Sequence, residues 1–418
     1  MPSIFRHISR MLSAIGPAFF AIGYTIGTGS VTTMVVAGSS FGMQLLWVLL
    51  LSCLGSWVLM EAYGRYALVT GETALYAFRK HLRGGWLLSL LIIVGISFGQ
   101  LNSLIGILGI SANAIFELMA LYVPSIKGFE YQAVLVIAVF IIGLMYGILL
   151  LGKYTLFERI LIFFVSLMGL SFFLSLFIVH PRLEDIASGL IPSIPQVENG
   201  KMLTAAFVGT TMAAATFVSR PLFIQGKGWV KEDLPRQFRD ALSAAILIFC
   251  ISGSIMAVAM GALYYRGLPV TRVLDMVQAL EPFAGRYAVA IFFTGTLAAG
   301  LSSIFPILMI TPLMIADYEK GQLDTTSTRF KILTGIACLI GLTVPILGSN
   351  PIRAQILTQV FNIFVLPAVV AGMAILINRS ELMGRHRAGI LMNIGLALAF
   401  VFSCLISWTG AVAIWEKL

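Results

Sequence analysis

The sequence predicts an all-α polytopic membrane protein made of two inverted five-helix repeats and an eleventh helix, with the first and sixth spans broken. Its composition supports this class, since 59% of the 418 residues are hydrophobic and only 11% are charged, whereas soluble domains carry about 25% charged residues. Apolar segments long enough to cross about 30 Å of hydrocarbon recur along the whole chain. Two of them carry clusters of glycine and hydroxyl residues at corresponding positions, which is typical of transporters with inverted repeats.

The apolar segments are expected to form eleven spans in one transmembrane domain, 1–418. They lie near residues 11–42, 44–64, 86–116, 131–151, 155–180, 203–225, 239–265, 286–316, 331–349, 355–377 and 388–415. The first five form repeat one, about 11–180, the next five form repeat two, about 203–377, and the last is an extra helix. Because each repeat has an odd number of spans, the second repeat crosses the membrane in the opposite sense.

The basic residues predict the orientation of the spans. In this topology most of the 27 Lys and Arg residues fall in loops on the side of the N-terminus, so the N-terminus is expected in the cytoplasm and the C-terminus outside. The net charge of +9 therefore does not indicate nucleic-acid binding. The first segment is too long for a signal peptide and lacks a small-residue cleavage site, so we expect it to be retained, in a bacterial inner membrane.

The sequence carries no pattern of an enzyme or of a cofactor site. Its cysteines lie in apolar runs without metal-ligand spacing, and we expect them to be small buried residues: Cys53, Cys250, Cys338 and Cys404. No Walker loop, hydrolase motif or redox motif occurs. We therefore expect neither enzymatic activity nor a cofactor.

The first span contains the strongest local signal. Residues 23–30 read Gly-Tyr-Thr-Ile-Gly-Thr-Gly-Ser, and each glycine costs roughly 1 kcal/mol relative to alanine in a helix interior. In lipid a broken helical turn survives only where it is buried in protein or lines a polar cavity. The pattern predicts a broken helix whose free ends hold a solute.

The sixth span contains a second weak stretch, at Phe207–Pro221. It combines Gly209, several threonines and a terminal proline, and it occupies the position that corresponds to the first span. The alternative interpretation, that small residues only allow helices to pack closely, applies better to isolated glycines elsewhere. We therefore expect spans one and six to be the two broken helices.

Several stretches resemble the Nramp family of proton-coupled divalent-metal transporters. They cover nearly the whole chain and comprise Gly16-Pro17, Ala37–Gly42, Leu45–Leu51, Tyr66–Ala74, Leu297–Ser303, Gln359-Val360, Leu366-Pro367 and Asn378–Gly384. The resemblance implies a LeuT-type arrangement of eleven helices.

The metal-binding motifs of that family are missing. Where the family has Asp-Pro-Gly-Asn in span one, this chain has Gly27, Thr28, Gly29 and Ser30, and the Met-Pro-His motif of span six falls on Ala213–Ala215. The acidic residues that the family carries in span three have no counterpart, and a histidine later in span six is replaced by Arg220. No metal ligands are therefore expected.

A small anion is the substrate that these departures favour. A divalent cation in a low-dielectric cavity needs negative charge nearby, whereas the glycine-rich break offers hydroxyls and the N-terminus of a half-helix, which attracts anions. The expected function is secondary transport of a small anion, with bicarbonate first and monocarboxylates next. Divalent-metal transport, of manganese or magnesium, is the first alternative. A non-transporting membrane sensor or scaffold is the second.

The expected substrate site joins spans one, six and ten. Its residues are Tyr24, Gly27, Thr28, Gly29, Ser30, Thr210, Ala213, Ala214, Ala215, Thr216, Gln359 and Asn362. The coupling ion is left open between sodium, for which Ser302 and Ser303 are candidate ligands, and the proton. No buried carboxylate is expected as a proton relay, and Arg220 with Lys227 could attract an anion to the inner mouth. Lipid is the other expected partner.

Overall fold

The computed structural model describes residues 17–151, 154–193, 200–268, 270, 273–347 and 351–416. Within these residues all regular structure is helical. The longer helices are α2 (Pro17–Thr25), α3 (Thr28–Phe41), α4 (Leu46–Thr70), α5 (Ala74–His81), α6 (Gly85–Tyr122), α7 (Glu130–Leu150), α8 (Tyr154–Val179), α10 (Gly200–Thr211), α11 (Ala214–Gly226), α12 (Leu234–Ala262), α13 (Val273–Lys320), α14 (Thr328–Gly341), α16 (Pro351–Asn362), α17 (Leu366–Ile377) and α19 (Ile390–Trp415). The short helices are α9 (Leu183–Ser188), α15 (Thr343–Leu347), α18 (Ser380–Met383), η1 (Pro124–Phe129), η2 (Lys231–Asp233), η3 (Tyr264–Arg266), η4 (Ile363–Val365) and η5 (Gly384–His386).

In the described part of the chain, nine helices are long and apolar enough to cross a membrane, and the count rises to ten when a bent pair is taken as one span. The expected segment that falls short is 331–349. There α14 ends at Gly341, the short α15 follows, and the residues after Leu347 lie outside the described part. The start of the first expected segment, 11–16, also lies outside it. The other expected segments coincide with helices, and the protein is an integral membrane protein.

Both expected breaks are present. In the first span, α2 and α3 are separated at Ile26 and Gly27 and bend by 52°. In the sixth span, α10 ends at Thr211 and α11 begins at Ala214. Each break exposes free carbonyls of one half-helix and free N–H groups of the other, because the last and first turns of a helix lack intrahelical partners.

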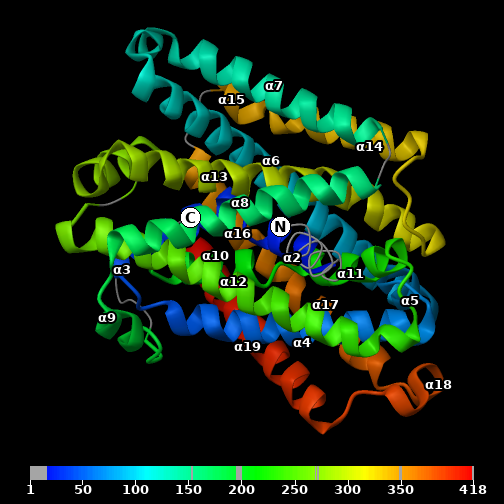
Figure 1. The fold of residues 1–418 in the computed structure, drawn as a ribbon. Helices are drawn as coiled ribbons and strands as arrows, with labels where there is room; N and C mark the ends of the chain where they lie inside the picture. The colour runs from blue at the N-terminus through cyan, green and yellow to red at the C-terminus, as the bar shows by residue number, and fades with distance from the viewer. Residues whose placement is uncertain are drawn as a thin grey trace, which may run out of the picture.

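The broken spans occupy the interior of the bundle (Figure 1). In the 18-residue apolar stretch taken from α10 and α11, 94% of the residues are buried inside the protein. The corresponding share is 22% for α19 and 33% for α7. In Figure 1, α7 and α19 lie at opposite edges, with α10 and α16 between them. The exposed apolar faces of the outer helices suit contact with lipid, while the Gly- and Thr-rich helices are shielded from it.

Candidate functional site

The first break is held open by a contact with span eight. A Cβ atom added to Gly27 would lie 2.4 Å from Ser303 Oγ of α13, so only glycine fits this close approach. Ser303 donates its hydroxyl proton to the backbone oxygen of Gly23. Span eight thereby occupies the space that a side chain at Gly27 would need, and it binds a carbonyl of the last turns of α2.

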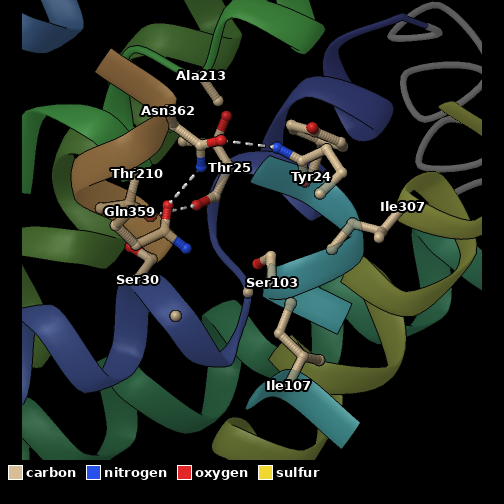
Figure 2. A pocket seen from close by; sticks show the side chains of 13 residues that line it. Tyr24, Thr25, Ser30, Ser103, Ile107, Thr210, Ala213, Ile307, Gln359 and Asn362 are labelled. Carbon is tan, nitrogen blue, oxygen red and sulfur yellow. Dashed lines mark hydrogen bonds between the residues drawn. The ribbon is translucent and has the colours of Figure 1, made fainter. Parts of the chain in front are cut away.

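A pocket lies where the two breaks meet (Figure 2). It is lined by Tyr24, Thr25, Gly27, Gly29, Ser30, Gln100, Ser103, Ile107, Thr210, Ala213, Ile307, Gln359 and Asn362. These residues come from α2, α3, α6, α10, α13 and α16 and from the two breaks. The cavity volume is about 20 Å³, which is room for a single water-sized group.

Eight of the twelve expected substrate residues line this pocket. They are Tyr24, Gly27, Gly29, Ser30, Thr210, Ala213, Gln359 and Asn362. The remaining four are Thr28, Ala214, Ala215 and Thr216, which are buried but do not line it. Because a helix turns by about 100° per residue, consecutive residues cannot all face one cavity.

Span three contributes residues that the sequence reasoning passed over. Gln100 and Ser103 of α6 line the pocket and are buried. The available signal was a pair of polar residues three positions apart in an apolar span, since that spacing places them on one helix face.

A chain of side-chain amides runs along one wall of the pocket (Figure 2). Gln100 Nε2 donates to Asn362 Oδ1 at 3.3 Å, and Asn362 Nδ2 donates to Gln359 Oε1 at 3.0 Å. These bonds fix the orientation of Asn362 and connect α6 with α16. The wall is therefore an ordered array of neutral oxygen and nitrogen atoms.

Hydroxyl groups at the two breaks lack hydrogen-bond partners in the protein. Tyr24 OH and Ser30 Oγ, which belong to pocket residues, are buried without a hydrogen-bond partner, as are Thr28 Oγ1 and Thr216 Oγ1 beside the pocket. Buried polar atoms in folded proteins are normally paired. The unpaired hydroxyls indicate that the pocket receives a polar or charged occupant.

The electrostatic character of the pocket comes from helix ends. No charged side chain is found among the residues described around it, and the described part of the chain contains no group of three or more His, Cys, Asp or Glu that could hold a metal ion. However, α2 and α10 both end at the pocket, at Thr25 and Thr211. The C-terminus of a helix carries about half a negative charge and favours cations.

Ser302 and Ser303 do not face the pocket. The hydroxyl of Ser302 donates to the backbone oxygen of Ala299 at 2.9 Å, and that of Ser303 is bound to Gly23. Both side chains are fully buried, and Ser303 joins α13 to α2. Their role as ligands of a coupling ion stays a prediction.

The expectation that no buried carboxylate is available is wrong. Glu61 and Asp240 are each 3% exposed and Asp317 is fully buried. Arg220 does not attract ions at an inner mouth either, because it is buried and paired with Asp240. Lys227 likewise forms an ion pair, with Glu158. The sequence placed these residues near span ends, and neighbouring helices cover them.

Comparisons with known proteins agree on one family. The family model described as natural resistance-associated macrophage protein-like, Nramp, matches residues 18–413. A divalent metal cation transporter MntH of Vibrio campbellii is 25% identical over 92% of this chain and 88% of its own length, and one of Ralstonia nicotianae is 26% identical over 98% and 92%. A solved manganese transporter of Eremococcus coleocola superposes with a TM-score of 0.72 at 15% identity, over 98% of this chain and 87% of its own.

MhsT, solved in complex with L-phenylalanine, superposes with a TM-score of 0.63 at 14% identity, over 96% of this chain and 98% of its own. These structural likenesses establish the LeuT-type fold: two inverted repeats with an added helix.

The names of the sequence relatives correct our expectation of a small anion. These proteins are divalent metal cation transporters, so bicarbonate as the substrate, and an anion as the partner, are wrong. The physical reason for the error is that we considered only the N-termini of the half-helices at the breaks. The C-termini of α2 and α10 reach the same pocket, and their carbonyls favour the opposite charge.

Proposed function

The chain belongs to the natural resistance-associated macrophage protein-like family, Nramp, and from this premise we propose that it carries a divalent metal cation across a membrane by alternating access. The membrane proposed is a bacterial inner membrane, with the N-terminus in the cytoplasm. The observation that carries the proposal is a pocket lined by neutral oxygen atoms that can bind a cation, at the place where α2 and α10 both end.

The ligand chemistry favours a hard cation, such as magnesium or manganese. The oxygen atoms available at the pocket are those of Tyr24, Ser30, Thr210, Gln359 and Asn362, together with carbonyls at the helix ends. Oxygen ligands suit Mg²⁺ and Mn²⁺, whereas imidazole and thiolate suit later transition metals. A site without carboxylates suits an ion that keeps part of its water shell, as Mg²⁺ usually does.

The size of the pocket indicates which step of transport this structure represents. A cavity of about 20 Å³ admits one water-sized group, so a hydrated cation needs a wider pocket than this one. The breaks supply the means, because a broken span can change the angle between its two half-helices at the break. We take this form to be a narrowed state between the two open ones.

Metal flux into proteoliposomes tests the proposal. Purified protein is reconstituted around a metal-sensitive dye, and Mn²⁺, Mg²⁺ or Ca²⁺ is added outside. We expect protein-dependent entry of Mn²⁺ or Mg²⁺. Entry of none of the three ions by monodisperse, folded protein would contradict the proposal.

A matched pair of variants tests whether the cation passes through this pocket. Gln100→Leu removes a pocket amide, whereas Asn102→Leu removes an amide of the same helix that binds only the backbone oxygen of Phe98. Loss of one polar contact to a charged group is worth about 1.5–3 kcal/mol, so Gln100→Leu should slow uptake roughly tenfold or more. Asn102→Leu should leave uptake near the wild-type rate. Equal effects of the two changes would place the cation elsewhere.

A further inference from the structure

A buried ion pair lies outside the pocket, between the second half of the sixth span and the seventh span. Arg220 Nη2 of α11 donates to Asp240 Oδ2 of α12 at 2.5 Å, and both side chains are only 1% exposed. A buried pair that loses one charge leaves the other uncompensated, which is strongly unfavourable. The substrate pocket makes no use of this pair, so it needs a separate explanation.

The pair connects four helices at one point. Asp240 Oδ1 accepts a hydrogen bond from the backbone N–H of Ala18 in α2, at 3.4 Å. Gln237 of α12 accepts two hydrogen bonds from Arg220 and donates to the backbone oxygen of Met60 in α4 at 2.9 Å. The first half of the broken first span is thereby tied to α4, α11 and α12.

A second carboxylate belongs to the same cluster. Glu61 of α4 lies close enough to Gln237 and Arg220 to interact with both, and its Oε1 accepts hydrogen bonds from Arg65. Its other oxygen, Oε2, is buried without a partner, and so is Nη1 of Arg220. The cluster therefore contains two carboxylates and two guanidinium groups, with one unsatisfied atom of each sign.

The cluster lies on the path between the pocket and the end of the bundle at which α2 begins. Ala18 and Tyr24 are six residues apart on α2, and Ala213 and Arg220 are seven apart across the start of α11, which corresponds to about 10 Å at 1.5 Å per residue. Opening the pocket toward this end requires α2 to separate from α11 and α12. The contacts of Asp240 and Arg220 oppose that separation.

We propose that Glu61, Arg220 and Asp240 form a proton-binding site that controls access to the pocket from the end of the bundle at which α2 begins. With both carboxylates ionised, the two guanidinium charges are balanced and the helices stay together. A proton on either carboxylate leaves the cluster with an excess positive charge, carried by the buried Arg220 and the partly exposed Arg65. Entry of water then relieves the excess charge, and α2 separates.

The charged groups on the surrounding helices are paired elsewhere or exposed at the surface. They are Glu158 with Lys227, Asp233 with Arg236, Glu72 with Lys80 and His81, Glu319 with Arg329, Asp317 of α13 with Thr73 and the backbone N–H groups of Leu75 and Tyr76, and Arg239, Arg385 and His386. The cluster is the point at which α2, α4, α11 and α12 meet around ionisable groups. The inference rests on the chain being a transporter but does not depend on which cation it carries.

Thiol labelling without any metal tests the proposal. Cys53, Cys250, Cys338 and Cys404 are first replaced, and Ala213→Cys places a reporter in the pocket. A membrane-impermeant thiol reagent is applied to sealed vesicles, and a protease site at the N-terminus identifies the vesicles that expose that side. The labelling rate is divided at each pH by the rate of the same reporter in the Glu61→Gln variant, so that ionisation of the thiol itself cancels.

The expected ratio is about 0.1 near pH 8 and approaches 1 near pH 5, because Glu61→Gln imitates the protonated cluster at every pH and coupling between two sites typically changes an equilibrium about tenfold. Asp240→Asn should give the same result and replaces Glu61→Gln if that variant does not fold. Glu158→Gln is the control, because this carboxylate is paired with Lys227 and lies outside the cluster. The wild-type labelling rate divided by the labelling rate of this control should stay near 1 at every pH.

The proposal is overturned if the wild-type labelling rate, divided by that of Glu61→Gln or of Asp240→Asn, does not change with pH. Metal flux, measured separately, decides the proposed function.

Discussion

Thr210 of α10 donates its hydroxyl proton to the backbone oxygen of Thr25, the last residue of α2, at 3.3 Å. This hydrogen bond joins the two broken spans at their C-terminal ends, within the lining of the pocket. Two helix ends of the same sign are thus held together by one hydroxyl. A cation placed beside them would reduce their mutual repulsion.

Replacement of Thr210 tests this connection. Thr210→Val keeps the branched shape but removes the hydroxyl, which should cost about 1 kcal/mol of stability and slow cation uptake. Thr210→Ser keeps the hydroxyl and should retain most of both. Thermal unfolding and metal flux, measured on the same preparations, check the pair. Uptake by Thr210→Val at the wild-type rate would remove the hydroxyl from the mechanism.

The close contact between Gly27 and Ser303 predicts that a side chain at position 27 destabilises the protein. Gly27→Ala places a Cβ atom 2.4 Å from Ser303 Oγ and 2.8 Å from Ser303 Cβ, and overpacking of this kind costs about 1–3 kcal/mol. We expect a lower melting temperature and reduced uptake. Ser303→Gly in the same chain clears both atoms, so the double variant should recover part of the loss. No recovery in the double variant would mean that the break tolerates no side chain for another reason.

The ion pairs of Glu72 are expected to make the stability of the protein depend on pH. Its partial burial acts to raise its pKa, but hydrogen bonds and charges from Lys80 and His81 outweigh burial, so the pKa of Glu72 lies below its usual value. A lowered pKa means that Glu72 contributes stability at pH values above its ordinary pKa, and that this contribution disappears as the pH falls through the lowered value.

Glu72→Gln should therefore lower the melting temperature at neutral pH and flatten the loss of stability on acidification below about pH 4.5. Glu416→Gln is the comparison, since Glu416 pairs with Lys201 and both side chains are about half exposed, where an ion pair adds little. Melting curves from neutral to acidic pH measure both variants. A Glu72→Gln profile parallel to that of the wild type would refute the assignment.

The sequence alone determined the membrane class, the helical repeats and the two breaks. These properties depend on local composition, because hydropathy over about twenty residues decides whether a segment can cross lipid and glycine density decides where a helix is weak. For the same reason Gly27 and Gly29 led directly to the pocket. Hydropathy predicted eleven spans, but in the described part of the segment 331–349, which ends at Leu347, α14 stops at Gly341, and hydropathy does not detect such a helix end.

Only the tertiary structure decided what surrounds the pocket and which carboxylates are buried. Gln100 meets Asn362 across 262 positions, and Thr210 meets Thr25 across 185, so no local pattern pairs them. Glu61 and Asp240 stand near span ends, and whether such residues reach water depends on the helices packed over them. The preferred charge of the substrate was likewise hidden, because helix ends of both signs meet at the breaks. The carbonyls of α2 and α10 come together only when the two repeats fold onto each other.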